Sequence, residues 1–344
     1  MRILTIRDIA SQAKVGISTV SRVLNNRPDV KEETRQKVLA VVDACNYTQN
    51  NNAKNMRMRQ SSTVSIIVRG RDNSFLYNTA EKMLQCAKDQ DYQYLIEYIG
   101  EKEDEFETAR QHLTEKKTQG IIFLGASIIG REEAIAQIKL PLVFATVDAS
   151  TLAGKRISSI GVDDRKAGQT AIDYLLDRGH RHIAMLGGKR EIPDSIGLRY
   201  CGVLDSFQNH GLSFDEALYV ESGFSMSAAY RATQGLLRGS RPFSAMFCTS
   251  DLMAVGAMKA ITDEGLAIGR DVSVIGFDGI ELGRYYTPTL ATISQPAEQI
   301  AQGSVDLMAA SLKDESFCHH VLLNTTLVEG GSAKPFPETG SSRL

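Results

Sequence analysis

From Thr63 onward, the sequence alternates short runs rich in β-branched residues with amphipathic stretches long enough to form helices. This alternation is typical of βαβ units, in which helices join parallel strands and cover the faces of a sheet. The strand-like runs are 64–68, 94–99, 121–124, 142–147, 182–186, 245–248 and 272–277. Because they form two groups, we expect an α/β body of two doubly wound parallel-sheet subdomains, with a ligand bound between them at the carboxyl ends of strands.

The first 48 residues carry helical patterns instead. Residues Thr5 to Asp8 have the form of a capping box, which starts a helix; a second short helix follows Gly16, and a third extends from Lys31 to Ala44. The apolar positions expected to face inward are Ile6, Ile9, Ala10 and Ala13, then Val20, Val23 and Leu24, then Val38, Leu39 and Val42. The sequence therefore predicts an all-α helix-turn-helix head closed by a third helix.

The second predicted helix carries polar side chains near its amino end, where Gly16 can serve as the N-cap. Its exposed face is predicted to present Ile17, Ser18, Thr19, Ser21 and Arg22. Such a helix suits the major groove of DNA, where its first amides meet phosphate and its side chains meet base edges. Arg22 can donate two hydrogen bonds to one guanine.

Charge is divided unevenly along the chain. Residues 1–60 contain eleven Lys and Arg against five Asp and Glu, a net charge of +6. Since the formal total is −2, residues 61–344 carry −8. Short polar segments also vary in charge by chance, but a basic head on an acidic body favours a polyanionic partner at the head alone.

The remaining composition excludes several classes of protein. The 344 residues exceed one ordinary domain, and no apolar run approaches the roughly 18 residues that a membrane span needs. The amino terminus lacks the pattern of a secretory signal, and the five cysteines are scattered. We therefore expect a cytoplasmic protein with reduced thiols.

Three motifs in the head resemble one family of regulators. Thr19 to Asn25, followed by Glu32 to Arg35 and by Asn46-Tyr47, is similar to the head of the lactose and galactose repressor (LacI/GalR) family. The resemblance implies a regulator of transcription that acts as a repressor. Because one small head contacts only about four or five base pairs, we expect a homodimer that binds a near-palindromic operator. The resemblance also implies DNA contacts from Thr5, Ile17, Ser18, Thr19, Ser21, Arg22, Asn25, Tyr47, Asn50, Ala53, Lys54 and Met56.

Two residues of the predicted turn depart from the family pattern. Lys14 stands where the family has Gly, and Gly16 where it has Ser, so the phosphate contact expected from that serine is lost. Either Lys14 holds a strained backbone with positive φ, or the turn is re-formed around Gly16.

Residues 49–61 are almost free of apolar side chains and should be disordered alone. The resemblance implies a hinge helix that forms on operator, with Met56 in the place of the family's leucine that wedges into the minor groove. The alternative is a flexible tether between the head and the body.

Motifs of the same family recur through the body. They are Asp72 to Leu76, Gly179 to Ile183, Asp251 to Ala257, Val274 to Asp278 and Pro288 to Ile293. The resemblance implies a periplasmic-binding-protein-like effector-binding and dimerisation domain over 62–330, whose chain crosses between two lobes. We expect one lobe from about 62–160 plus 293–322, the other from 161–292 plus 323–330, and a flexible tail at 331–344.

The resemblance also implies an effector site. Its predicted residues are Asp72, Phe75, Leu76, Asp148, Ser195, Arg199, Phe224, Ser250 and Asp278. Arg199 would grip ligand oxygens with Asp278 as its carboxylate partner, and Phe224 would stack on a sugar or a base. Asp251, Asp163 and Asp164 are interpreted instead as helix caps.

No catalytic arrangement is legible, because the six histidines show no HExxH spacing and no Walker loop is present. We expect no enzyme activity, cofactor or metal. The predicted effector is a sugar or sugar derivative. The alternatives are a purine-type corepressor, or a sugar-binding protein without a role in transcription; a transport binding protein would not carry residues 1–60.

Overall fold

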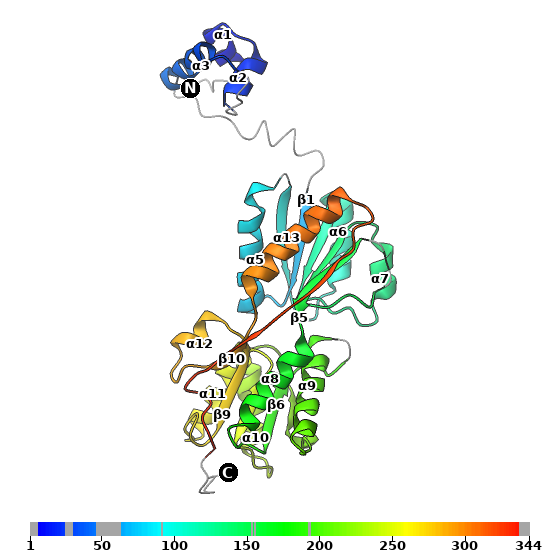
Figure 1. The fold of residues 1–344 in the computed structure, drawn as a ribbon, viewed down its shortest axis with the longest axis vertical. Coiled ribbons are helices and arrows are strands. Elements are labelled where there is room, and N and C mark those ends of the chain that lie inside the picture. Colours follow the sequence, from blue (N-terminus) through cyan, green and yellow to red (C-terminus); the bar gives the residue numbers. More distant parts are fainter. Residues whose placement is uncertain are drawn as a thin grey trace. The chain divides into compact units, whose positions relative to one another are not determined.

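The computed structural model describes residues 6–24, 30–45, 63–90, 92–152, 154, 156–191 and 194–336. Residues 1–62 and 63–344 form two compact units, hereafter the head and the body. Each unit is described by itself (Figure 1).

The head contains three helices in its described residues. They are α1 (Ile6–Ala13), α2 (Ile17–Leu24) and α3 (Glu32–Ala44). Each helix contributes an apolar side chain to one small core, and Ile9, Val20 and Val38 are completely buried there. The predicted all-α helix-turn-helix is confirmed.

The turn between α1 and α2 gives Lys14 a φ of 52°. The amide of Val15 donates to the carbonyl of Ala10 at 3.0 Å, which closes the end of α1. Of the two alternatives for this turn, the chain adopts the first, with Lys14 in the left-handed region. For a residue other than glycine, that conformation costs about 1–2 kcal/mol.

The inward face of α3 differs from the prediction at one position. Val38 is buried and Val42 is half-buried, but Leu39 is 36% exposed, so its predicted place in the core is wrong. Positions 38 and 42 are one turn apart and share a face, whereas position 39 is rotated toward solvent. Asn46, Tyr47 and the predicted hinge at 49–61 lie outside the described residues.

The first lobe of the body is built on a six-stranded sheet of described residues with the order β11-β5-β4-β3-β1-β2. Its neighbouring strands are all parallel. The strands are β1 (Thr63–Arg69), β2 (Gln93–Ile99), β3 (Thr118–Leu124), β4 (Leu142–Ala145), β5 (Ile157–Val162) and β11 (His320–Leu323).

Helices cover both faces of this sheet (Figure 1). One face is covered by α5 (Ser74–Cys86), which leads into η1 (Ala87–Asp89), and by α13 (Ala297–Lys313). The other face is covered by α6 (Glu105–Glu115) and α7 (Glu132–Gln137). Alternate residues of β1 enter the two cores: Ile66 packs with α5 and α13, and Ile67 packs with α6.

The second lobe repeats this architecture with the strand order β12-β10-β9-β8-β6-β7 in its described residues. All neighbours are parallel except β12, which is antiparallel to β10. The strands are β6 (Ile183–Gly187), β7 (Tyr219–Glu221), β8 (Ala245–Cys248), β9 (Ser273–Asp278), β10 (Ala291–Ser294) and β12 (Thr326–Val328).

Two helices lie on each face of the second sheet. One face is covered by α8 (Asp164–Leu176) and α9 (Ser195–Asn209), and the other by α10 (Met226–Leu237) and α11 (Asp251–Asp263). The short elements η2 (Glu216–Leu218) and α12 (Glu281–Tyr285) complete this lobe.

The predicted fold class is confirmed, because both lobes are doubly wound parallel-sheet subdomains. Within the described body the chain passes between the lobes three times, after β5, β10 and β11. The strands run past two of the expected lobe boundaries: β5 keeps residues 161–162 in the first sheet, and β10 keeps residues 293–294 in the second.

Residues 331–336 were expected to belong to a flexible tail, and this expectation is wrong. Ser332 is completely buried; its hydroxyl donates to the carbonyl of Val274 at 2.6 Å and accepts from the amide of Ala291 at 2.8 Å. The amide of Phe336 donates to the carbonyl of Arg178 at 2.8 Å. The segment therefore satisfies backbone groups of the second lobe and is part of it.

Candidate functional site

The outer face of α2 carries the described part of the predicted DNA contacts. Val20 and Val23 turn into the head core, which leaves the opposite face of the helix toward solvent. On that face Ile17, Ser18 and Arg22 are exposed, and Thr19 and Ser21 are half-buried. The short helix therefore presents an apolar group, hydroxyls and a guanidinium together, as base readout requires.

Gly16 occupies the N-cap position of α2. Its carbonyl accepts from the amides of Thr19 and Val20, at 2.9 and 3.1 Å, and these are the first hydrogen bonds of the helix. The amides that precede these bonds, those of Ile17 and Ser18, have no acceptor within the helix, so they are suited to a phosphate. Thr5, Asn25, Tyr47, Asn50, Ala53, Lys54 and Met56 lie outside the described residues, and their roles stay predictions.

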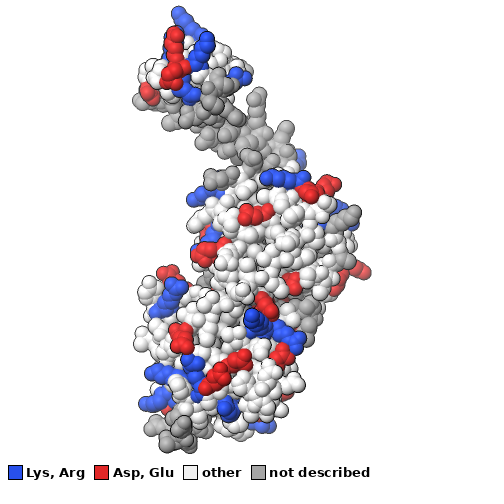
Figure 2. Space-filling view, viewed as in Figure 1, with Lys and Arg blue, Asp and Glu red and all other residues white. Residues whose placement is uncertain are grey.

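On the face of the body visible in Figure 2, basic and acidic side chains are interspersed. They do not gather there into one basic stripe of the kind that follows a DNA backbone. The charge pattern of this face agrees with an acidic body that leaves contact with a polyanion to the head.

In the body, Arg199 of α9 is the most constrained of the predicted effector residues. It is 7% exposed; its Nε donates to Oδ1 of Asp164 at 2.8 Å, and its Nη1 donates to the carbonyl of Thr249 at 2.9 Å. Its guanidinium carbon lies 3.5 Å from the centroid of the Phe277 ring. The guanidinium is thus fixed in place before any ligand arrives.

Asp164 was interpreted as a helix cap, and this is wrong. Asp163 caps α8 by accepting from the amide of Lys166 at 3.0 Å, whereas Asp164 forms the buried ion pair with Arg199. Burial raises the pKa of the Asp164 carboxyl, although Arg199 opposes this shift. The carboxylate bonded to Arg199 is therefore Asp164 rather than the predicted Asp278.

Asp278 ends β9 with a φ of 120° and is buried. Its Oδ1 accepts from Nε2 of Gln295 at 2.9 Å, and the backbone amide of Asp251 also donates to its carboxylate. Burial, and next the charge of Asp251, raise the pKa of Asp278 to about 8. A buried carboxyl at a strand end, held by neutral donors, keeps acceptor capacity for a ligand.

Asp251 was also interpreted as a helix cap, and the structure corrects this. The N-cap of α11 is Ser250, whose hydroxyl accepts from the amide of Met253 at 3.2 Å. Asp251 follows it, and its Oδ2 accepts from the amides of Gly279 and Ile280, each at 2.8 Å. Its carboxylate thereby holds the turn that follows Asp278.

The second oxygen of Asp251, Oδ1, accepts from the hydroxyl of Thr292 at 2.6 Å. Burial raises the pKa of Asp251 to about 7, against the effect of these donors. Asp251 and Asp278 are therefore neighbouring buried carboxyls whose ionised forms disfavour each other.

Ser195 and Phe224 lie in the second lobe, and Ser195 contacts the first. The Ser195 hydroxyl donates to the carbonyl of Thr146 at 3.3 Å, and the hydroxyl of Ser127 donates to Oδ2 of Asp194 at 3.4 Å. Phe224 is half-buried and packs near Gly188, at the carboxyl end of β6. Polar contacts between the lobes thus converge on the start of α9, close to Asp164 and Arg199.

The predicted first-lobe residues are less closely gathered. Phe75 and Leu76 are buried in the core beneath α5, and Asp72 is exposed. Asp148 is half-buried, and its Oδ1 accepts from the amide of Ser150 at 2.9 Å. Their contact with a ligand stays a prediction.

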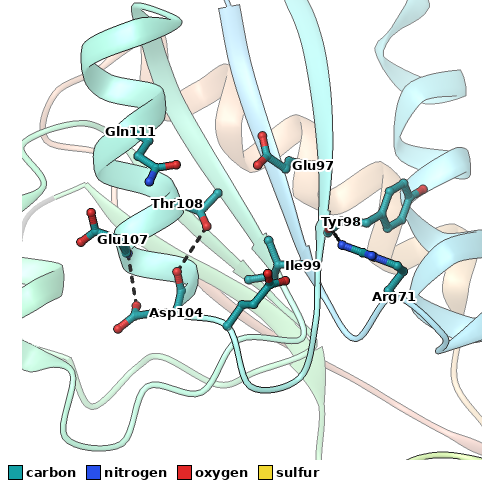
Figure 3. A pocket seen from close by; sticks show the side chains of 9 residues that line it. Arg71, Glu97, Tyr98, Ile99, Asp104, Glu107, Thr108 and Gln111 are labelled. Carbon is teal, nitrogen blue, oxygen red and sulfur yellow. Dashed lines mark hydrogen bonds between the residues drawn. The ribbon is translucent and has the colours of Figure 1, made fainter.

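A pocket of about 350 Å³ lies between β2 and α6 (Figure 3). It is lined by Arg71, Glu97, Tyr98, Ile99, Glu103, Asp104, Glu107, Thr108 and Gln111. None of these is a predicted effector residue. Asp104 is used to cap α6 and to pair with Arg131, and Arg71 donates to the carbonyl of Tyr98 at 3.4 Å. Because its polar groups serve the local fold, we do not assign the effector to this pocket.

Sequence reasoning missed Gln295 and the pairing role of Asp164. Gln295 follows β10, which was not among the predicted strands, so nothing in the spacing linked it to Asp278. The pair Asp163-Asp164 stands at a helix start, where capping is the ordinary interpretation of either residue.

Among the described residues, no group of three or more His, Cys, Asp and Glu side chains is arranged to hold a metal ion. No helix in the same part of the chain combines the length and the apolarity needed to cross a bilayer.

Comparison with known proteins gives matches in both units. Residues 5–50 match the family described as "Bacterial regulatory proteins, lacI family", and residues 172–333 match "Periplasmic binding protein-like domain". The chain is 32% identical over 332 residues to the HTH-type transcriptional regulator MalR of Clostridium butyricum, covering 96% of this chain and 99% of that relative. It is also 32% identical over 338 residues to the probable HTH-type transcriptional repressor ExuR of Bacillus subtilis (strain 168), covering 96% and 98%.

Solved structures agree with these relatives. The lac repressor dimer bound to operator and the anti-inducer ONPF matches with a TM-score of 0.78 and 26% identity, covering 97% of this chain and 100% of that one. A complex of the transcriptional regulator CelR with cellobiose matches with a TM-score of 0.72 at 22% identity, covering 96% and 100%, and supports the fold.

Proposed function

The chain belongs to the lacI family of bacterial regulatory proteins, and from this premise we propose that it acts as a homodimer on a near-palindromic operator. We propose further that a sugar or sugar derivative bound by the body controls its affinity for the operator. The predicted resemblance is confirmed. Like its relatives, the chain is a DNA-binding regulator of transcription and not an enzyme.

The outer face of α2 supports the proposed operator contact. A helix of eight residues offers only a few side chains to one half-site, so two heads are needed for a usable sequence preference. The lac repressor structure that this chain resembles is a dimer bound to operator. We propose the same arrangement here, with repression as its outcome and the cytoplasm as its location.

The buried Arg199, fixed by Asp164 and near enough to Asp278 for its charge to oppose the raised pKa of that carboxyl, is the observation that carries the effector proposal. A guanidinium supplies donors and a carboxylate supplies acceptors, so together they suit the hydroxyl groups of a sugar. Relatives include the ribose operon repressor of Haemophilus influenzae, 30% identical over 324 residues. The contacts of Ser195 and Asp194 with the first lobe support a coupling in which ligand binding changes the lobe arrangement and, by linkage, operator affinity.

Selection of binding sites from random duplexes with the full-length protein tests the operator proposal. We expect enrichment of a two-fold related sequence with half-sites spaced by the DNA helical repeat. Enrichment of a single half-site would argue against a dimer on DNA. The absence of any sequence preference at physiological salt, with and without sugars, would contradict the function itself.

A purine-type corepressor is the second candidate for the effector. The half-buried Phe224 favours it, since an aromatic ring can stack on a base as well as on a sugar face. A thermal-shift screen of the full chain against sugars and nucleobases separates the two, because a bound effector raises the unfolding temperature.

A further inference from the structure

A line of polar side chains crosses the core of the first lobe at the point where the body begins. Its members are His112 of α6, Ser65 of β1 and Thr118 of β3, and they are 1%, 0% and 6% exposed. Polar groups in a core are costly unless each one is bonded, and when all are bonded they fix a single geometry. Because the bonds of these three residues end at Thr63, we call them the Thr63 anchor.

The bonds of the Thr63 anchor all point in one direction. The Ser65 hydroxyl donates to Oγ1 of Thr118 at 3.0 Å. The Thr118 hydroxyl in turn lies 3.1 Å from the carbonyl oxygens of Thr63 and Gly120. Since Thr118 uses the one proton of Ser65, the neighbouring Nδ1 of His112, at 2.8 Å from Oγ of Ser65, is the donor of that contact. The position of the imidazole therefore determines where Ser65 and Thr118 are held.

Thr63 is the residue at which the body begins. Residues 1–62 form the other unit, so any coupling that passes along the backbone between head and body passes through this residue. The pairing of β1 with β3 is also irregular here, because Thr63 pairs with Thr118 whereas Val64 pairs with Gly120. Such a shift interrupts the regular ladder of hydrogen bonds. The Thr118 hydroxyl spans the shift and holds the first residue of β1 in place.

Two opposite charges hold the imidazole at its other nitrogen. Nε2 of His112 lies 2.6 Å from Oε2 of Glu97 and 2.6 Å from Nζ of Lys116. Glu97 belongs to β2, on the opposite side of the pocket from α6 (Figure 3). A hydrogen bond from Lys116, and next one from His112, lower the pKa of the Glu97 carboxyl. The ring is thus fixed at both nitrogens.

The first residue of α6 is bonded to the segment that contacts the second lobe. Glu105 is 2% exposed, and its Oε1 accepts from the backbone amide of Ser127 at 2.9 Å. The Ser127 hydroxyl donates to Asp194 of the second lobe at 3.4 Å. Glu105 and His112 are two helical turns apart, about 10 Å along the axis, and they share the buried face of α6. One rigid helix therefore joins a contact between the lobes to the Thr63 anchor.

We propose that α6 transmits the arrangement of the two lobes to the head, and that it does so through the Thr63 anchor. The inference rests on the proposed function, because it assumes that the effector changes the contact between the lobes. A displacement of Ser127 moves the start of α6, the helix carries this displacement to His112, and the anchor carries it to the start of β1. His112 is accordingly a positioning residue for operator binding.

The proposal also gives the direction of the effect when the anchor is broken. With Thr63 held in one position, the chain leaves the body in one direction before any DNA is bound. Without the anchor, this residue gains conformational freedom that must be lost again on the operator. Operator affinity should therefore fall, while the duplex sequence that the head prefers stays the same.

Thr118→Val removes the hydroxyl that reaches Thr63 and keeps the shape of the side chain. With the full-length protein and the duplex obtained by binding-site selection, we expect the dissociation constant in fluorescence anisotropy to rise at least about fivefold. Thr118→Ser keeps the hydroxyl and should stay within about twofold of the wild type. The control is Thr79→Val, because the Thr79 hydroxyl is completely buried in the same lobe but donates to the carbonyl of Phe75 within α5. Its operator affinity should be unchanged.

The control separates positioning from stability. Wild-type operator affinity in Thr118→Val would overturn the proposal, and so would an equal loss in Thr79→Val, since that would be a general effect of weakening the lobe. Both variants are compared at a temperature at which circular dichroism shows them to be folded. If Thr118→Val is unfolded there, Ser65→Ala breaks the anchor one bond earlier, with the same expected loss and the same contrary result.

A double-mutant cycle tests the role of α6. Glu105→Ala removes the acceptor that α6 offers to Ser127, and Thr118→Val breaks the anchor. In the described part of the chain Glu105 and Thr118 have no hydrogen-bond partner in common, so independent effects on the dissociation constant would multiply. We expect the double variant to depart from that product by at least about threefold.

Simple multiplication of the two effects would remove α6 from the coupling and overturn the proposal. The proposed function is tested separately by the wild type. If the wild type selects no duplex, the proposed function fails, and the inference fails with it. If the wild type selects an operator and Thr118→Val binds it equally well, the inference fails alone.

Discussion

The two recognition regions of this protein use arginine in opposite ways. Arg22 stands on the exposed face of α2, a helix whose opposite side forms the head core. Arg199 is buried in the second lobe, bonded to Asp164 and to the carbonyl of Thr249. The first surface is built within eight consecutive residues, and the second from side chains that four separate segments bring together.

On α2, the residues that recognise DNA are different from those that hold the helix in place. In the second lobe, the same residues serve both binding and folding. The outer face of α2 can change its side chains without disturbing Val20 and Val23, which hold the helix. In the second lobe, Arg199 and Asp278 would contact the effector, and each also forms a hydrogen bond with a buried neighbour. Substitutions in the body should therefore affect stability and binding together, and substitutions on α2 should affect binding alone.

The largest expected effect is the loss of Arg199. Arg199→Leu leaves the Asp164 carboxylate buried without its cation, and we expect the free energy of unfolding to fall by about 3–5 kcal/mol in urea titrations. Without the guanidinium the pKa of Asp164, already raised by burial, rises further. The destabilisation should therefore shrink as the pH is lowered from 8 to 5, because protonation removes the buried charge.

Arg165→Leu is the matched control for Arg199→Leu. Arg165 pairs with Asp205 at 2.6 Å on the surface of α8, and we expect its loss to have a much smaller effect that does not vary with pH in this way. Equal destabilisation by the two variants would break the comparison, since it would show that burial does not distinguish Arg199.

The contact between α8 and α9 gives the next largest effect. An added Cβ at Gly202 would lie 1.9 Å from the carbonyl oxygen of Arg165, so the helices would have to move apart and carry Arg199 and Asp164 with them. We expect Gly202→Ala to lower the free energy of unfolding by about 3 kcal/mol.

Gly235→Ala adds the same methyl group in α10, where no atom lies within 4 Å of the new Cβ. It should stabilise the body by up to about 1 kcal/mol, because alanine favours a helix over glycine. Thermal or urea unfolding measures the expected fall in the free energy of unfolding for Gly202→Ala and the expected rise for Gly235→Ala. An unchanged free energy of unfolding in Gly202→Ala would mean that the close contact between α8 and α9 does not fix Arg199 and Asp164 in place.

The same contrast explains what the sequence could predict. The head could be predicted because its helix starts, its inward face and its exposed polar residues all follow from residues that are close together in the sequence. Leu39 was misplaced because an apolar residue next to Val38 satisfies a loose helical pattern while facing solvent. The two parallel sheets were predictable from seven strand-like runs, whereas edge strands such as β7 and β12 have three residues each and carry little pattern.

The effector site was predictable only in part. Arg199 and Asp278 matched family motifs, and the structure gathers both at the strand ends of one lobe. The roles of Asp164, Asp251 and Gln295 depend on which backbone groups face them after folding, and a local pattern does not contain this. An acidic residue at a helix start is interpreted as a cap unless its distant partner is known.

A smaller effect, confined to binding, is expected on α2. Arg22→Ala should cost about 1–3 kcal/mol of operator affinity and relax the base preference at one position in each half-site. Its unfolding temperature should match that of the wild type, because the side chain is exposed. Binding-site selection followed by titration of the selected duplex measures both quantities.

Lys37→Ala removes an equal charge from α3 and is the control for Arg22→Ala. It should leave the selected sequence unchanged, even if overall affinity falls through a lost phosphate contact. If Arg22→Ala selects the wild-type sequence, Arg22 does not contribute to base readout. The base preference would then have to come from the other exposed residues of α2.

The smallest effect concerns the head turn, where Lys14 holds a φ of 52°. Lys14→Gly removes the strain of a left-handed side chain, but glycine loses more backbone entropy on folding, so we expect a net gain of only about 0.5 kcal/mol. Lys37→Gly, in the regular part of α3, should instead destabilise the head by about 1 kcal/mol. Opposite signs in thermal unfolding of the two variants, followed by a head-specific probe, would show that this turn is stabilised by the helices it joins and not by its own residue.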